Sequence, residues 1–193
     1  MADEELIVAG WVLVRVVDAP VSVGVSLPPH LLTISDCIQP DLPKPGPCLG
    51  DWFQDPAQAE QAAARLTPSP ALLTVAMAPS DASTFVKEWE GETPWFERLH
   101  RAEALAPEAA VLGYEVVGAE EVLDFHSWHC HGYADDARRD LGISLNHLGL
   151  IATLQEARSV MRWMLGLPSD QAPKPVPWTV VALAGQRGPG ALS

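Results

Sequence analysis

Strand-like and helix-like segments alternate irregularly along this chain, and their order limits the folds that it can adopt. The segments whose valine content and alternation favour strands are 7–18, 71–77, 110–118 and 178–184. They show no regular β-α-β period, no internal repeat and no glycine-rich phosphate loop. We therefore predict an α+β fold, with a mixed or antiparallel sheet and helices packed mainly on one face; a doubly wound α/β fold is the alternative.

Capping residues mark the helices between these strands. Asp55 followed by Pro56 predicts the start of a helix that runs to Leu66, and Thr153 with Glu156 forms a capping box. Further helices are predicted from Ser80 to Gly91, from Pro94 onward, and before Gly142. The apolar face predicted for the last helix consists of Leu154, Ala157, Val160, Met161, Met164 and Leu165.

The N-terminal part favours β-structure, with a hairpin between 7–18 and 21–27. Four prolines between Gln39 and Trp52 predict a loop. A chain of 193 residues suits a single compact domain over 1–193, in which 1–50 can form a β-rich subregion and 185–193 a disordered tail.

The charge is strongly acidic, with 25 Asp and Glu against 12 Lys and Arg and a formal net charge of −13. Such a field repels nucleic acid and anionic membrane surfaces and attracts basic partners, although it also simply favours solubility. No signal-peptide pattern or membrane-spanning apolar run is expected, and the cysteines Cys37, Cys48 and Cys130 form no spaced motif. These features predict a cytoplasmic protein with reduced thiols.

The segment FHSWHCHGY, from Phe125 to Tyr133, concentrates three histidines and a cysteine. If 123–131 is a strand, His129 and His131 lie on one face and can share a Zn²⁺ ion. A third ligand would then come from His126 or His147, or from the acid pair Asp135 and Asp136, whose positions the sequence leaves open.

The sequence also suggests two kinds of chemistry other than zinc binding. Cys130 is a possible nucleophile next to His129 or His131, but neighbouring residues on a strand point to opposite faces. The acid pairs Glu120–Glu121 and Asp135–Asp136 suit general acid–base work or, more commonly, solvated helix starts.

The simplest interpretation of the same segment is structural packing. Trp128 and Cys130 then lie in the core, while Ser127, His129 and His131 occupy the other sheet face with their ring nitrogens hydrogen-bonded. The sequence LNHLGLI, from Leu145 to Ile151, supplies an Asn–Gly turn before the last helix.

The motifs LGYEVVG at 112–118, FHSWHC at 125–130 and LNHLGLI at 145–151 occur in this order and are followed by a helix. Together they resemble a group of small bacterial proteins associated with immunity to secreted or contact-delivered toxins. The resemblance covers about residues 95–165, and His131 departs from its pattern, which has Asn after the cysteine. It implies a non-enzymatic protein without a cofactor that binds a toxin domain and blocks its active site.

The function predicted from these features is therefore an acidic cytosolic binding protein of immunity type, whose partner is a basic toxin domain. The alternative is a metal-dependent enzyme that uses zinc held by His129 and His131. A self-associating structural protein is a third possibility.

Overall fold

A computed structural model describes residues 4–18, 25–35, 38, 52–89, 94–120 and 125–186. Its main feature is a six-stranded sheet in which each neighbouring pair is antiparallel. The strand order is β4 (Trp52–Phe53), β1 (Ile7–Val14), β5 (Ala71–Met77), β8 (Trp178–Gln186), β6 (Ala109–Ala119) and β7 (Phe125–Ser127). A separate ribbon pairs β2 (Val17–Asp18) with β3 (His30–Leu31). The predicted α+β class is confirmed.

The sheet curls so that side chains from its two edge strands come into contact. β4 and β7 stand at opposite ends of the strand order, yet the rings of Trp52 and Phe125 stack with centroids 4.6 Å apart and planes 3° from parallel. Register shifts after Val8 in β1 and after Val111 in β6 mark irregularities of the kind that bend a strand. The curl encloses the largest apolar cluster, to which alternate residues of the strands contribute.

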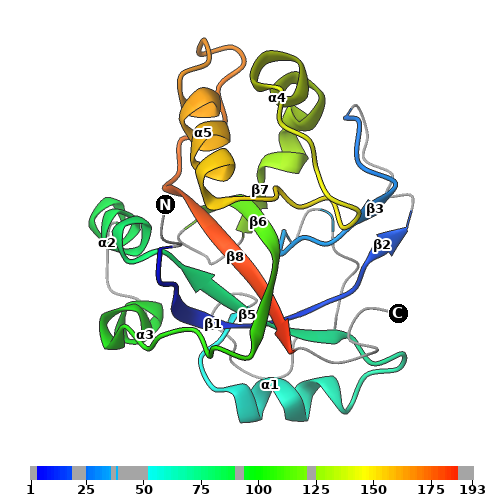
Figure 1. Ribbon diagram of the computed structural model, residues 1–193, viewed down its shortest axis with the longest axis vertical. Helices are drawn as coiled ribbons and strands as arrows, with labels where there is room; N and C mark the ends of the chain where they lie inside the picture. The colour runs from blue at the N-terminus through cyan, green and yellow to red at the C-terminus, as the bar shows by residue number, and fades with distance from the viewer. Residues whose placement is uncertain are drawn as a thin grey trace.

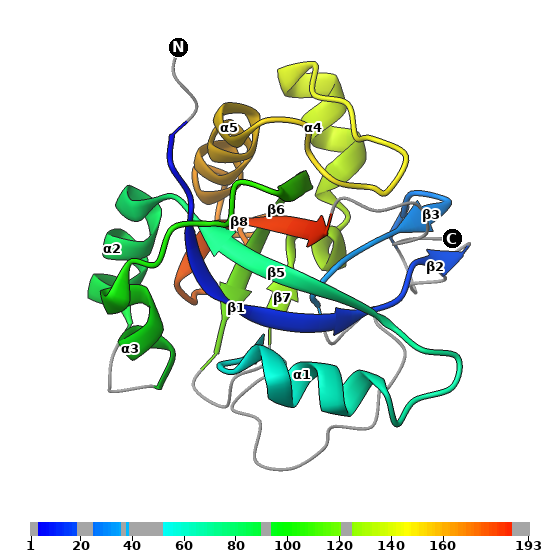
Figure 2. The same ribbon diagram turned by 60° about the horizontal axis from the view of Figure 1, so that its bottom comes forward.

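Helices cover the outer side and one end of this curled sheet (Figure 1). They are α1 (Pro56–Ala63), α2 (Pro79–Glu88), α3 (Pro94–Arg101), α4 (Tyr133–Leu141) and α5 (Leu154–Leu165), with a 3₁₀ helix η1 (Trp128–His131) before α4. α4 and α5 stand next to each other and share an apolar cluster with β6 and β8. α1 packs below β1 and β5, where Figure 2 shows it in front.

The predicted capping interactions form. Asp55 Oδ1 accepts a hydrogen bond from the Ala57 amide at 3.0 Å, and Thr153 Oγ1 accepts one from the Glu156 amide at 3.2 Å. Gly142 ends α4 with a φ of 70°, a left-handed conformation that glycine adopts without a steric penalty. Local sequence therefore sets the ends of these helices.

The N-terminal pairing differs from the prediction. β1 pairs with β4 and β5, and β2 pairs with β3, so the 7–18 segment does not form its own hairpin with 25–27; residues 21–24 lie outside the described part. Residues 39–51 and most of the predicted tail also lie outside it, while Gly185 and Gln186 extend β8. Within the described ranges, no helix is long and apolar enough to cross a membrane.

Candidate functional site

The histidine-rich segment changes conformation at its midpoint. It is a strand only over Phe125–Ser127 and then turns into η1. Ser127 Oγ accepts a hydrogen bond from the His129 amide at 3.1 Å, and Gly132 ends the turn with a φ of 72°. The prediction of a strand through His131 was therefore wrong, because a cap at Ser127 stops the alternation of side chains.

His129 consequently points into the protein. It is 0% exposed, its Nε2 lies 3.0 Å from the Gly149 carbonyl oxygen, and its ring contacts Trp128. Because a carbonyl only accepts, Nε2 carries the proton. Burial lowers the pKa of His129 to about 4, so the ring is neutral at pH 7. The expectation that His129 lies on the sheet face opposite Trp128 and the core is corrected by this position.

His126 and His131 lie on the outer side of the segment. His126 Nε2 is 3.1 Å from Glu120 Oε1, which also contacts Lys174 Nζ, and the His131 ring stacks on Tyr133 with centroids 5.3 Å apart. Burial, and after it the charge of His126, lowers the pKa of His131 below its usual value. The two histidines are therefore close enough for the charge of one to affect the other.

The other proposed metal ligands are dispersed. His147 is exposed in the turn before α5, and Asp135 and Asp136 form ion pairs of 2.7 Å with Arg138 and Arg139 along α4. Across the described ranges, no group of three or more His, Cys, Asp or Glu side chains is placed to hold a metal ion. The argument that an H-x-H pair shares one strand face no longer applies to this segment.

The inner side of the segment contains a buried carboxyl that the sequence analysis missed. Glu115, on β6, is 0% exposed and accepts hydrogen bonds from Thr33 Oγ1, from the Ile34 amide at 3.0 Å and from Ser127. Burial raises the pKa of Glu115 to about 7, although these three donors favour the ionised form. A glutamate at an inward position of the apolar strand sequence GYEVV was the available signal.

Cys130 belongs to the same interior region. Its Sγ lies 3.0 Å from Ser35 Oγ, and the Ser35 amide donates to Thr33 Oγ1 at 3.1 Å. The thiol therefore helps to hold the 33–35 segment against η1. Glu121, Cys37 and Cys48 lie outside the described residues.

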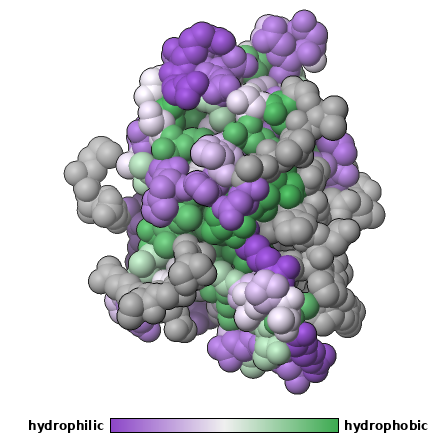
Figure 3. All heavy atoms as spheres, turned by 90° about the vertical axis from the view of Figure 1, so that its right-hand side faces the viewer, coloured by the Kyte–Doolittle hydropathy of each residue, from purple (hydrophilic) through white to green (hydrophobic). Residues whose placement is uncertain are grey.

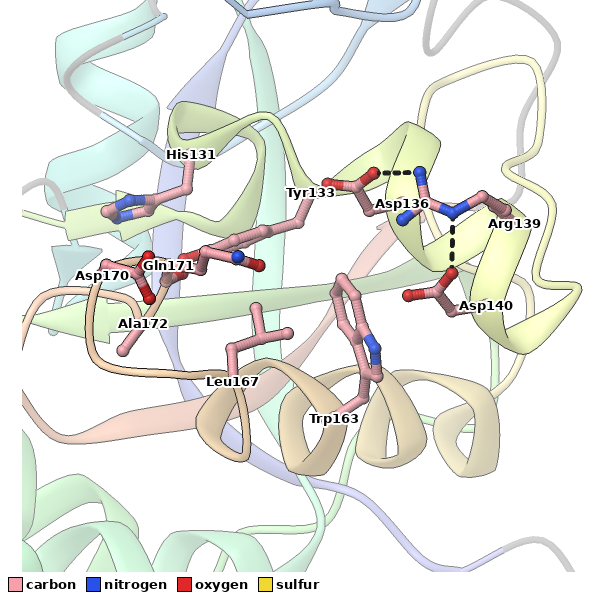
Figure 4. A pocket seen from close by; sticks show the side chains of 10 residues that line it. All are labelled: His131, Tyr133, Asp136, Arg139, Asp140, Trp163, Leu167, Asp170, Gln171 and Ala172. Carbon is pink, nitrogen blue, oxygen red and sulfur yellow. Dashed lines mark hydrogen bonds and ion pairs between the residues drawn. The ribbon is translucent and has the colours of Figure 1, made fainter.

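A pocket of about 400 Å³ opens on the outer side, between η1, α4, α5 and the turn that follows α5 (Figure 4). The lining residues are His131, Tyr133, Asp136, Arg139, Asp140, Trp163, Leu167, Asp170, Gln171 and Ala172. Tyr133 and Trp163 meet edge to face with centroids 5.9 Å apart, and the Tyr133 hydroxyl donates to the Gln171 carbonyl at 2.7 Å. This hydrogen bond holds the 168–172 turn against α4.

Trp11 and Trp163 are the two partly exposed tryptophans among those whose side chains are described. Four of the others are buried (Trp52, Trp89, Trp128 and Trp178), and the Arg98 guanidinium lies 4.3 Å from the ring centre of Trp11. Trp163 is partly exposed in the pocket. Trp163 does not belong to the predicted apolar face of α5, and this position could have indicated its exposure from the sequence. Leu165 was predicted on that face but is 52% exposed.

The residues that line the pocket have a net negative charge. Asp136, Asp140 and Asp170 face a single guanidinium, that of Arg139, which is paired with Asp136 at 2.7 Å and with Asp140 at 2.8 Å. With His131 neutral at pH 7, the lining carries a net charge of −2. The arrangement suits recognition of a positively charged group.

No protein-family model, no curated protein and no solved structure matches this chain.

Proposed function

We propose that this protein is an acidic, non-enzymatic cytoplasmic binding protein of immunity type, which neutralises a basic toxin domain by covering its active site. The observation that carries the proposal is the pocket between α4 and α5. It combines a partly exposed tryptophan with three carboxylates and one arginine. Tryptophans in partly desolvated pockets are common anchors of protein interfaces.

The charge of the whole chain supports the same function. A net charge of −13 accelerates the encounter with a basic partner and opposes binding to nucleic acid. The upper end of the molecule in Figure 3, where α4 and the end of α5 lie, is hydrophilic. A polar rim around an aromatic anchor is the usual anatomy of a reversible protein interface.

The hydrogen-bonding of the histidine segment also favours binding over catalysis. His129 is committed to the Gly149 carbonyl and is neutral at pH 7, and Cys130 lies against Ser35. These contacts tie the segment to the 33–35 and 145–151 regions. They give a rigid base for α4, from which Tyr133 enters the pocket.

The test is co-expression with basic toxin domains, beginning with any that are encoded beside the gene, read out as cell survival and, with purified proteins, as affinity by calorimetry. We expect survival with one such toxin and an affinity that decreases as the salt concentration increases. Trp163→Ala should weaken binding by about 2 kcal/mol or more, as expected for an interface anchor.

Leu165→Ala is the matched control, because Leu165 is exposed on the same helix and does not line the pocket. Failure to bind or neutralise any of these toxins would disprove the proposed function. If Trp163→Ala and Leu165→Ala lose the same binding free energy, the pocket is not part of the interface.

A further inference from the structure

The pocket has two recognition elements that are directed at the same space. One is the aromatic wall made by Trp163, which is partly exposed, and by Tyr133, which is only 6% exposed and has His131 stacked on it at an interplanar angle of 14°. The other is the carboxylate rim of Asp136 and Asp140 on α4 and Asp170 in the turn after α5. Figure 4 shows Trp163 on the side of Asp136 and Asp140, whereas Asp170 lies at the opposite end of the pocket, near His131.

Arg139 already indicates which group the carboxylates accept. Its guanidinium bridges Asp136 and Asp140, and its side chain is 68% exposed at the edge of the pocket. Among the described contacts, Asp170 has no basic partner. The Asp170 carboxylate and the exposed part of the Trp163 ring are therefore left for a cation from outside the chain.

We propose that this pocket receives an arginine side chain of the protein partner. The inference rests on the proposed function for the origin of that arginine. A planar guanidinium stacks on aromatic rings and donates two parallel hydrogen bonds to a carboxylate, which suits a pocket with both features. An ammonium group is more strongly hydrated and makes only point contacts, so lysine suits this pocket less well.

The other lining groups agree with a cationic occupant. Burial keeps His131 neutral at pH 7, so no second positive charge opposes entry. A volume of about 400 Å³ is in the range of small-ligand pockets, which is enough for one long side chain. Phosphate and other anions are repelled by the net charge of −2 that Asp136, Asp140, Asp170 and Arg139 give the lining.

The experiment uses N-acetyl-arginine methylamide as the probe and the full-length protein, with the Trp163 indole N–H signal followed by NMR. We expect saturable, millimolar binding, typical of a small fragment. N-acetyl-citrulline methylamide has the same length and a planar end without the charge, and should bind about tenfold more weakly because the charge-assisted hydrogen bonds are lost. The corresponding lysine probe should also bind less tightly than arginine.

Two exposed substitutions test the assigned geometry without disturbing the core. Asp170→Asn should lower the affinity for the arginine probe severalfold. Arg139→Gln should raise this affinity severalfold, because the internal guanidinium no longer competes for Asp136 and Asp140. Leu165→Ala should leave the affinity unchanged. Equal binding of arginine and citrulline, tighter binding of lysine, or no effect of Asp170→Asn would each overturn the inference.

These outcomes are separate from those of the proposed function. If a toxin is neutralised but the arginine probe does not bind, the assignment of the pocket fails and the immunity function stands. If the arginine probe binds as expected and no toxin is recognised, the pocket is a guanidinium site and the immunity function fails.

Discussion

Polar groups lie in opposite environments on the two sides of the segment from Phe125 to His131: buried on one side and exposed on the other. On the inner side, the Glu115 carboxyl is covered completely and receives hydrogen bonds from Thr33, Ile34 and Ser127. On the outer side, the pocket leaves Trp163 partly exposed and Asp170 without a basic partner among the described contacts. Satisfied buried groups specify the fold, whereas incompletely matched groups at a surface are available for recognition. Variants on the inner side should therefore change stability, and variants on the outer side should change binding.

The largest effect is expected from Glu115→Ala. This change opens a cavity inside the curled sheet and removes the acceptor to which the Thr33 hydroxyl and the Ile34 amide donate. We expect a loss of about 4 kcal/mol in the free energy of unfolding, measured by urea denaturation. Glu115→Gln keeps an acceptor for the Ile34 amide and should lose much less. A loss below about 1 kcal/mol for Glu115→Ala would mean that the carboxyl is not part of a cooperative network.

The same network predicts an unusual dependence of stability on pH. The pKa of Glu115 is raised from 4.5 to about 7, so the folded state binds this proton more tightly, and its contribution to stability increases as the pH falls from 7 to 4.5. The pKa of His129 is lowered from 6.5 to about 4, so its contribution is present above pH 6.5 and is lost as the pH falls towards 4. The two contributions oppose each other over most of this interval.

If either Glu115 or His129 is replaced, the pH dependence of stability caused by the other should become visible. Relative to the wild type, Glu115→Gln should lose stability and His129→Gln should gain stability on acidification from pH 7 to 4.5. Each difference should amount to about 3 kcal/mol, because one pKa unit corresponds to about 1.4 kcal/mol. Urea denaturation at a series of pH values measures both profiles. Parallel profiles for all three proteins would show that neither pKa is shifted.

A smaller effect on stability is expected where the turn after α4 meets the inner side. Gly149 has a φ of 75°, and an added Cβ would lie 2.7 Å from Leu31 Cδ1 and 3.2 Å from the His30 carbonyl. Gly149→Ala should cost about 2 to 3 kcal/mol from backbone strain and this contact together. Gly142→Ala is the matched control, since its φ is 70° and nothing lies within 4 Å; it should cost only about 1 kcal/mol. Thermal unfolding of both variants measures the difference, and equal costs would show that Leu31 moves aside freely.

The smallest effect on stability is expected in the pocket. Asp170→Asn removes an exposed charge that makes no described ion pair, so the urea midpoint should stay close to that of the wild type. The affinity for the basic partner should decrease nonetheless, mainly through slower association at low salt. A clear loss of stability with unchanged affinity would place Asp170 among the structural residues and contradict the division between the two sides.

Sequence patterns predicted the local elements well because short-range interactions determine them. The Asp55 and Thr153 caps act on amides within three residues, and the α+β class follows from the order of strand-like and helical segments. The error in the histidine segment also has a local cause, since Ser127 accepts a hydrogen bond from the His129 amide and ends the strand. A Ser two residues before a His was too weak a signal against the strand pattern.

The candidate site required the tertiary structure. Thr33 and Glu115 are 82 residues apart, and Ser35 and Cys130 are 95 residues apart, so no sequence window contains these pairs. Tyr133, Trp163 and Asp170 likewise line one pocket only because α4 and α5 pack on the same face of the sheet. The sequence alone determined the acidic charge, the starts of the helices capped by Asp55 and Thr153, and the presence of the histidines, whereas the helices predicted to end at Leu66 and Gly91 end at Ala63 and Glu88. Only the folded chain decided which histidine is buried and neutral and which lines the pocket, because burial and long-range partners set the chemistry of an ionisable side chain.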